Sequence, residues 1–106
     1  MGLLDFLKKE DINDGVLEFQ NTPKAVLLDV RTPEEFKQGY IPRSQNIPLQ
    51  LIDNTKHVIE DKNTPIFVYC RSGNRSGQAK TLLEAMGYAN VKNIGGIISY
   101  KGQIAK

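Results

Sequence analysis

Two uninterrupted runs of apolar residues constrain the fold of this chain of 106 residues most strongly. The first run covers residues 25–28 and continues to Val30, and the second covers residues 66–69. Both runs contain β-branched or aromatic residues and lack the alternation of polar and apolar side chains that marks a half-exposed strand. We therefore interpret both as strands that are buried on their two faces.

A helical pattern follows the second run. Within residues 80–86 and just before them, apolar side chains recur at spacings of three and four, and Gly87 is a stop signal. This pattern predicts an amphipathic helix whose apolar stripe faces the core. The stripe consists of Ala79, Leu82, Leu83 and Met86.

A shorter helix is predicted to begin at Thr32. Thr32 is a good N-cap residue, Pro33 suits the first helical position, and Glu35 completes a capping box. We expect Phe36 to be the inward-facing anchor of this helix.

Strands of continuous apolar character that alternate with helices predict right-handed crossovers and a parallel sheet. We therefore expect a single α/β domain over residues 1–106, with a central parallel sheet flanked by helices on both faces and residues 1–9 as a loose N-terminal segment. Weaker patterns predict the remaining elements: helices at residues 14–19 and 49–59, a strand at residues 91–94, and a last helix after Gly95 and Gly96.

Charge and cysteine content narrow the class of protein. Fourteen Lys and Arg against twelve Asp and Glu give a net charge of only +2, without a basic run, which argues against nucleic acid as a partner. We find no signal-peptide pattern, no apolar run long enough to span a membrane and no complete lipidation motif. We therefore expect a cytoplasmic monomer that does not bind membranes. The single cysteine, Cys70, is either a buried apolar side chain or a nucleophile.

The position of Cys70 favours the nucleophile. It follows the second apolar strand and precedes a helix, which is where open parallel sheets place ligand sites. Gly73 allows the connecting loop to turn its N–H groups inward, and the helix N-terminus adds positive potential. Both effects stabilise a thiolate, so no general base is required.

Other residues near this loop carry charge but no obvious catalytic partner. The only histidine, His57, is interpreted as an exposed helix residue, and no metal ligand set is recognisable. Arg71 and Arg75 flank the loop and suit an oxyanion, so sulfur transfer and phosphoryl transfer are both compatible with these residues. We interpret Asp29 and Arg31 as a structural ion pair.

Residues 70–76, Cys-Arg-Ser-Gly-Asn-Arg-Ser, resemble the active-site loop of single-domain rhodaneses, the thiosulfate and persulfide sulfurtransferases. Three further segments agree with that family in order and spacing. They are residues 28–36, residues 39–42 leading to 46–48, and residues 95–97. The resemblance covers most of the chain from Asn13 onward and implies a single rhodanese-like domain.

The resemblance also implies a reaction and a site. Cys70 would take sulfane sulfur from a small anionic donor, such as thiosulfate, or from a persulfide donor, and would carry it as a persulfide. The acceptor would be cyanide or a thiol, including a thiol of another protein. The reaction would need no cofactor or metal. Related cysteine phosphatases have a loop one residue longer, whereas Cys70 to Arg75 spans six positions. A non-catalytic persulfide carrier and a cysteine phosphatase stay open as alternatives. The expected substrate-binding residues are Arg71, Ser72, Gly73, Asn74 and Arg75.

Some positions differ from the common family pattern. Tyr40 stands where histidine is frequent, Arg43 and Ser44 replace a small Gly-Ala pair, and Tyr100 replaces a frequent tryptophan. These differences concern the rim of the site. One hypothesis is that Arg43 adds positive charge near the entrance.

Overall fold

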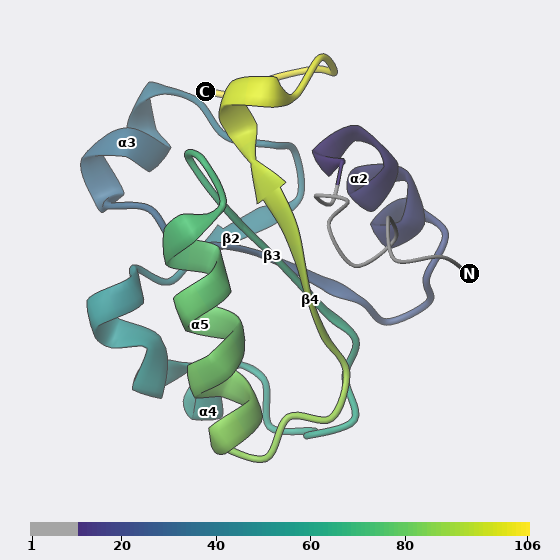
Figure 1. Ribbon diagram of the computed structural model, residues 1–106, viewed down its shortest axis with the longest axis vertical. Helices are drawn as coiled ribbons and strands as arrows, with labels where there is room; N and C mark the ends of the chain where they lie inside the picture. The colour runs from purple at the N-terminus through teal and green to yellow at the C-terminus, as the bar shows by residue number, and fades with distance from the viewer. Residues whose placement is uncertain (1–10) are drawn as a thin grey trace, which may run out of the picture.

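A four-stranded parallel sheet organises the computed structural model, which describes residues 11–106. The strands lie in the order β2-β1-β3-β4, so the two buried strands predicted from the sequence are the central pair (Figure 1). Their bounds are β1 Val26–Asp29, β2 Ser44–Asn46, β3 Ile66–Cys70 and β4 Val91–Gly96. The parallel sheet and the α/β class are confirmed.

The register of the sheet places the ends of the central strands side by side. Asp29 at the end of β1 pairs with Tyr69 of β3, and Cys70 pairs with Gly96 of β4. All five residues of β3 are buried, as a continuous apolar run predicts. The edge strand β2 was not predicted, because its Ser-Gln-Asn sequence is short and polar.

One face of the sheet is covered by α5 (Asn74–Ala85), the 3₁₀ helix η1 (Leu49–Asn54) and α4 (Thr55–Val58). The predicted helix over residues 49–59 is therefore a 3₁₀ segment joined to one α-helical turn. The predicted helix at residues 80–86 is the second half of α5, which begins directly after the Cys70 loop. The main buried side chains on this face are Leu28, Val30, Ile47, Ile52, Ile66, Val68, Ala79, Leu83, Tyr88 and Val91.

The other face is covered by α2 (Ile12–Gln20). Its N-cap is Asp11, whose side chain accepts a hydrogen bond from the Asn13 backbone N–H. Figure 1 shows α2 and α5 on different sides of the strands. The cluster between α2 and the sheet contains Ile12, Val16, Phe19, Leu27, Ile41, Phe67, Tyr69 and Ile94.

Three local expectations are wrong in detail. Phe36 of α3 (Pro33–Gln38) is only half-buried and stacks on Tyr40 with ring centroids 4.2 Å apart, although the Thr32 capping box is present as predicted. Leu82 is exposed instead of core, because α5 turns that side chain toward solvent. The last helix is only the 3₁₀ turn η2 (Ile97–Ser99). The expectation of a loose segment at residues 1–9 lies outside the described residues.

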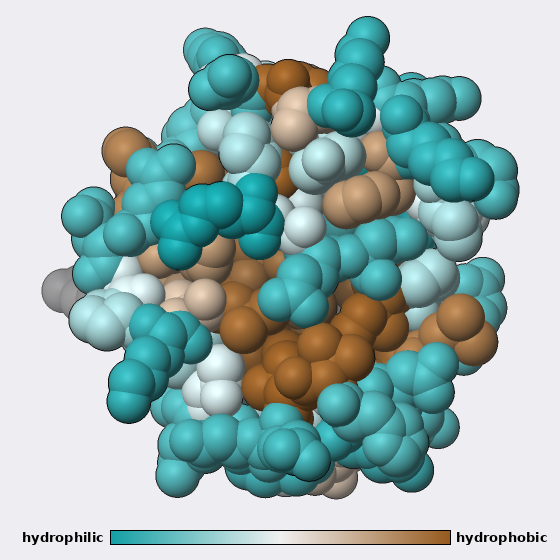
Figure 2. All heavy atoms as spheres, turned by 180° about the vertical axis from the view of Figure 1, so that it is seen from behind, coloured by the Kyte–Doolittle hydropathy of each residue, from teal (hydrophilic) through white to brown (hydrophobic). Residues whose placement is uncertain are grey.

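Some apolar side chains also reach the surface. Figure 2 shows a hydrophobic patch in the middle of the face opposite the view of Figure 1. At the carboxyl end of the sheet, Ile98 and Ile104 are 67% and 42% exposed. Within residues 11–106, no helix is long and apolar enough to cross a membrane.

Candidate active site

Cys70 is the last residue of β3, and its side chain is enclosed by the loop that leads into α5. The Cys70 Sγ accepts a hydrogen bond of 3.0 Å from the Gly73 backbone N–H. Gly73 has φ +106°, a left-handed conformation that other residues adopt only with strain. The predicted turn of the loop around the sulfur is therefore present, and Cys70 is only 1% exposed.

Ser76, on the first turn of α5, is the second neighbour of the sulfur. Its Oγ lies 3.4 Å from the Cys70 Sγ and 2.7 Å from the Asn93 Oδ1. A serine hydroxyl has a single proton to donate, so these two acceptors compete for it. The shorter contact to Asn93 is the preferred one while Cys70 is a neutral thiol.

The surroundings of Cys70 act on its pKa in opposite directions. Burial raises the pKa of the thiol, and hydrogen bonds from the Ser76 side chain and from the backbone N–H groups of Ser76, Gly73 and Ser72 lower it. The hydrogen bonds outweigh the burial, so the pKa of Cys70 lies below its ordinary value. The site therefore favours the thiolate, which is the nucleophilic form of cysteine.

Asn93 of β4 connects this loop to the sheet. Its Nδ2 donates to the Gly73 carbonyl at 3.1 Å, and its Oδ1 accepts from the Gly95 N–H at 3.1 Å as well as from Ser76. β4 carries one extra residue here, because Val68 pairs with Asn93 while the next residue of β3 already pairs with Gly95. Asn93 was not predicted from the sequence, because it precedes the double glycine without being part of it.

The second glycine of the double-glycine segment allows close packing behind the loop. A Cβ at Gly96 would overlap the Arg71 carbonyl oxygen and the Ser72 Cα. The Arg71 carbonyl also accepts a hydrogen bond of 3.2 Å from the Ile98 N–H. Gly96 therefore lets β4 and η2 support the back of the Cys70 loop.

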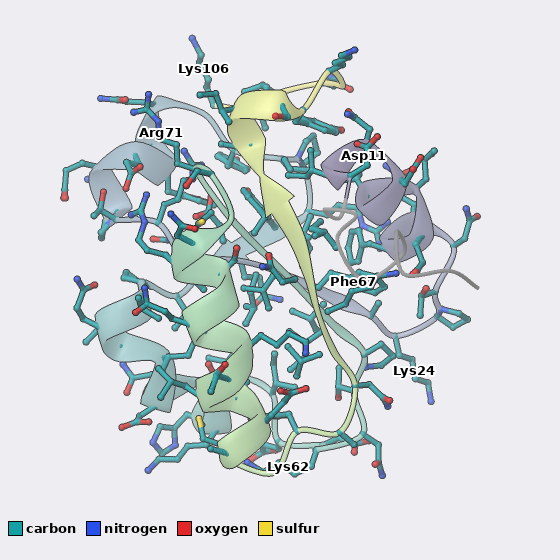
Figure 3. The ribbon with its side chains drawn as sticks, in the orientation of Figure 1. Asp11, Lys24, Lys62, Phe67, Arg71 and Lys106 are labelled. Atoms are coloured by element: carbon teal, nitrogen blue, oxygen red, sulfur yellow. The ribbon has the colours of Figure 1, made fainter. Side chains whose placement is uncertain are left out.

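The two arginines of the loop have different surroundings. Both terminal nitrogens of Arg75 donate to the Glu35 carboxylate, at 2.7 and 3.0 Å. Arg71 is exposed and has no ion pair within the described residues. Figure 3 shows Arg71 at the same end of the molecule as Lys106, whereas Lys62 lies at the other end of α5. Arg71 is thus the open cation of the loop, and Arg75 is held by α3.

Glu35 is fixed from two sides. Besides pairing with Arg75, its Oε1 accepts hydrogen bonds from the Thr32 N–H at 3.0 Å and from the Thr32 hydroxyl at 3.1 Å. The Arg75 hydrogen bonds are the largest cause that lowers the pKa of Glu35 to about 2. Glu35 is therefore ionised at neutral pH. From the sequence, Glu35 was predicted only as part of the capping box.

Asp29 and Arg31 form the buried ion pair that was predicted. The Arg31 Nη2 lies 2.6 Å from the Asp29 Oδ2, and both side chains are at least 93% buried. The same Nη2 donates to the Gly39 carbonyl at 2.7 Å, which joins the end of β1 to the segment after α3. This pair stabilises the loops around the site.

Arg43 does not lie near the entrance, so the hypothesis about it is wrong. The neighbouring Ser44 pairs with Leu27, toward the start of β1, whereas Cys70 lies at the carboxyl ends of the strands. The Arg43 guanidinium packs over the Phe19 ring at 4.8 Å. His57 is exposed in α4, as predicted.

Two cavities adjoin the loop. The larger, of about 630 Å³, is lined by three loop residues, Ser72, Gly73 and Asn74, and by residues of α2, β4 and the C-terminal segment. The smaller, of about 320 Å³, has a charged side and an apolar side. Its lining consists of Arg31, Glu35, Gln38, Gly39, Arg71, Ile97, Ile98 and Ile104. In the described part of the chain, no cluster of His, Cys, Asp and Glu side chains could hold a metal ion.

Comparisons with known proteins identify the family to which the chain belongs. The family model described as the Rhodanese-like domain matches residues 13–103. Thiosulfate sulfurtransferase PspE of Escherichia coli is 42% identical over 71 residues, which cover 66% of this chain and 68% of that protein. A protein named Sulfurtransferase from Allochromatium vinosum is 42% identical over 81 residues, covering 76% of this chain and 75% of that protein.

A solved structure described as a rhodanese with anions from E. coli is also similar. It is 37% identical, with a TM-score of 0.73, and the match covers 77% of this chain and 98% of that chain. The family model, the relatives and the fold all point to the same family. The chain therefore belongs to the rhodanese family of sulfurtransferases.

Proposed function

We propose that this protein transfers sulfane sulfur through a persulfide on Cys70. The Cys70 thiolate attacks the outer sulfur of thiosulfate, the bond between the two sulfur atoms of thiosulfate breaks, and sulfite leaves with the electron pair. A persulfide donor would react in the same way and release a thiolate. Cyanide or a thiolate acceptor then attacks the outer sulfur of the persulfide, and the Cys70 thiolate leaves and is regenerated.

The observation that carries this proposal is the enclosure of the Cys70 Sγ by the loop. A sulfur at 3.0 Å from the Gly73 N–H, with its pKa lowered, is stabilised as an anion without a histidine. A persulfide is also anionic at its outer sulfur, so inward N–H groups of the same loop would stabilise the intermediate. No cofactor takes part in the proposed reaction.

The size of the loop favours sulfur transfer over phosphoryl transfer. Ser76 stands six positions after Cys70, where the phosphatase pattern has arginine, and its hydroxyl lies 3.4 Å from the sulfur. The arginine one position earlier, Arg75, is engaged with Glu35. The short loop and the absence of an arginine at position 76 therefore support sulfur transfer over phosphoryl transfer.

In this proposal the natural acceptor is a thiol, which can belong to another protein. The protein is proposed to act as a monomer in the cytoplasm. A single cysteine cannot resolve its own persulfide, so the sulfur must leave to another molecule. A carrier that only passes sulfur between partner proteins would form the same persulfide on Cys70 as an enzyme. It differs from an enzyme in having no turnover with small molecules.

Turnover with small molecules tests the proposal. We expect the wild type to form thiocyanate from thiosulfate and cyanide, with a rate proportional to protein concentration, and Cys70→Ser to form none. The absence of thiocyanate in the wild type, with a persulfide still formed, would support the carrier. Hydrolysis of an aryl phosphate at a rate equal to thiocyanate formation would contradict the loop-size argument.

A further inference from the structure

The charges at the entrance of the Cys70 loop nearly cancel. Three arginines lie at this end of the sheet, and two of them are paired with carboxylates: Arg31 with Asp29 and Arg75 with Glu35. Of these three arginines, only Arg71 has no carboxylate partner within the described residues. Three positive and two negative charges leave a net charge of +1, and the Cys70 thiolate offsets this remaining charge.

Charges on the other side of the loop do not alter this balance. The larger cavity has one cationic and one anionic side chain in its lining, Lys101 and Asp11. Thiosulfate carries two negative charges and approaches a sulfur that is itself anionic. The site therefore has too little positive charge for a good match to a dianion.

Glu35 is the residue that determines this balance. Glu35 binds Arg75 through both carboxylate oxygens. These hydrogen bonds are the main cause that raises the pKa of Arg75, and the charge of the nearby Cys70 sulfur is a further cause. Without Glu35, the positive charge of Arg75 would lose the carboxylate that neutralises it. Glu35 also lines the smaller cavity together with Arg71, so its negative charge lies beside the open cation of the loop.

We propose that Glu35 is a specificity-determining residue that selects sulfur donors of at most one negative charge over dianions such as thiosulfate. It acts by neutralising Arg75 and by placing a carboxylate in the lining of the cavity beside Arg71. This inference deepens the function proposed above. It predicts that the protein uses thiosulfate less well than a persulfide of lower charge.

The variant Glu35→Gln tests the role of the charge with little change of shape. Glutamine still accepts a hydrogen bond from Thr32, as it does in other capping boxes, so the start of α3 is retained. Glu34→Gln is the matched control, because Glu34 is exposed on the same helical turn and the net charge changes equally. Glu35→Gln/Arg75→Gln restores the wild-type net charge at the entrance.

The first measurement compares two alkylating agents of similar size on Cys70, the anion iodoacetate and the neutral iodoacetamide. The ratio of their rate constants cancels differences in thiolate fraction and does not depend on sulfur transfer. We expect Glu35→Gln to raise the ratio by about threefold at low salt, and high salt to remove most of the gain. Glu34→Gln and the double variant should have the wild-type ratio.

The second measurement is the KM for thiosulfate in the cyanide assay. We expect Glu35→Gln to lower this KM by about fivefold at low salt with kcat nearly unchanged. A purely structural role of Glu35 would slow both alkylating agents equally and leave their ratio unchanged, which would overturn the inference. An equal rise of the ratio in Glu34→Gln, or a gain that persists in the double variant, would overturn it as well.

The two proposals fail in different ways. A wild type that is alkylated at Cys70 but forms no persulfide contradicts the proposed function, and the alkylation ratios still decide the role of Glu35. A wild type that forms the persulfide but shows no change of ratio in Glu35→Gln contradicts the role of Glu35 alone.

Discussion

Ser76 and Asn93 are joined by a 2.7 Å hydrogen bond in which the Ser76 hydroxyl donates to the Asn93 Oδ1, and the same hydroxyl lies 3.4 Å from the Cys70 sulfur. Ionisation of Cys70 favours rotation of the proton toward the sulfur, because a thiolate is a stronger acceptor than a thiol. Ser76 can therefore stabilise the reactive form of Cys70 without any movement of the backbone.

Replacement of Ser76 by Ala should raise the pKa of Cys70. The Ser76 side chain is the first of the hydrogen bonds that lower this pKa against the effect of burial. We expect the pH profile of Cys70 alkylation to move to higher pH and the rate at pH 7 to fall roughly three- to tenfold. Thr81→Ala, which removes an exposed hydroxyl from the same helix, is the control. An unchanged pH profile in Ser76→Ala would contradict this role of Ser76 and would show that the backbone N–H groups alone lower the pKa of Cys70.

The glycines near the loop should respond differently to a methyl group. Gly96→Ala places a Cβ against the Arg71 carbonyl and Ser72, so we expect a displaced loop and at least tenfold slower alkylation of Cys70. Gly77→Ala is the control, because its Cβ would meet only the Asn93 Nδ2, at an ordinary 3.5 Å. This helix variant should be more stable by about 0.5–1 kcal/mol, as measured by urea unfolding, and should keep the reactivity of Cys70. Equal alkylation rates in the two variants would contradict the close approach behind the loop.

The ion pair of Glu35 with Arg75 should make stability depend on pH in the acid range. Because folding lowers the pKa of Glu35 from 4.5 to about 2, the stabilisation is complete above pH 4.5 and is lost as the pH falls toward 2. The two side chains are 27% and 32% exposed, so screening by water reduces the expected contribution to about 1–2 kcal/mol.

Urea unfolding of the wild type and Glu35→Gln at several pH values measures this contribution. The difference in unfolding free energy should be constant from pH 5 to 7 and shrink below pH 4.5. Glu34→Gln should show no comparable change. A difference between wild type and Glu35→Gln that is independent of pH down to 2 would refute the linkage.

The sequence predicted those parts of the fold that depend on neighbouring residues. The continuous apolar runs around Leu28 and Val68 identified the two central strands, and the Thr-Pro-Glu-Glu pattern identified the cap at Thr32. The edge strand β2 was missed because Ser44–Asn46 pairs with β1 through its backbone, which leaves no mark in its side chains. The outward rotation of Leu82 depends on how α5 packs, and its spacing alone cannot show this.

The same distinction applies to the candidate site: features within the loop could be predicted from the sequence, and contacts from distant residues could not. The position of Cys70 and the conformation of Gly73 were predicted because both belong to one short loop. Asn93 and Glu35 reach that loop across separations of about 20 and 40 residues, through an extra residue in β4 and through the placement of α3. Such contacts depend on three-dimensional register, so neither role could be inferred from local spacing.

Intact mass after mixing with a sulfur donor tests the central claim, that Cys70 carries the transferred sulfur. We expect the wild type to gain the mass of one sulfur atom with thiosulfate or with an alkyl persulfide of lower charge, and cyanide to remove it. Cys70→Ser should gain nothing from either donor. A wild type that stays unmodified with both donors, or a Cys70→Ser variant that still gains a sulfur that cyanide removes, would contradict the account.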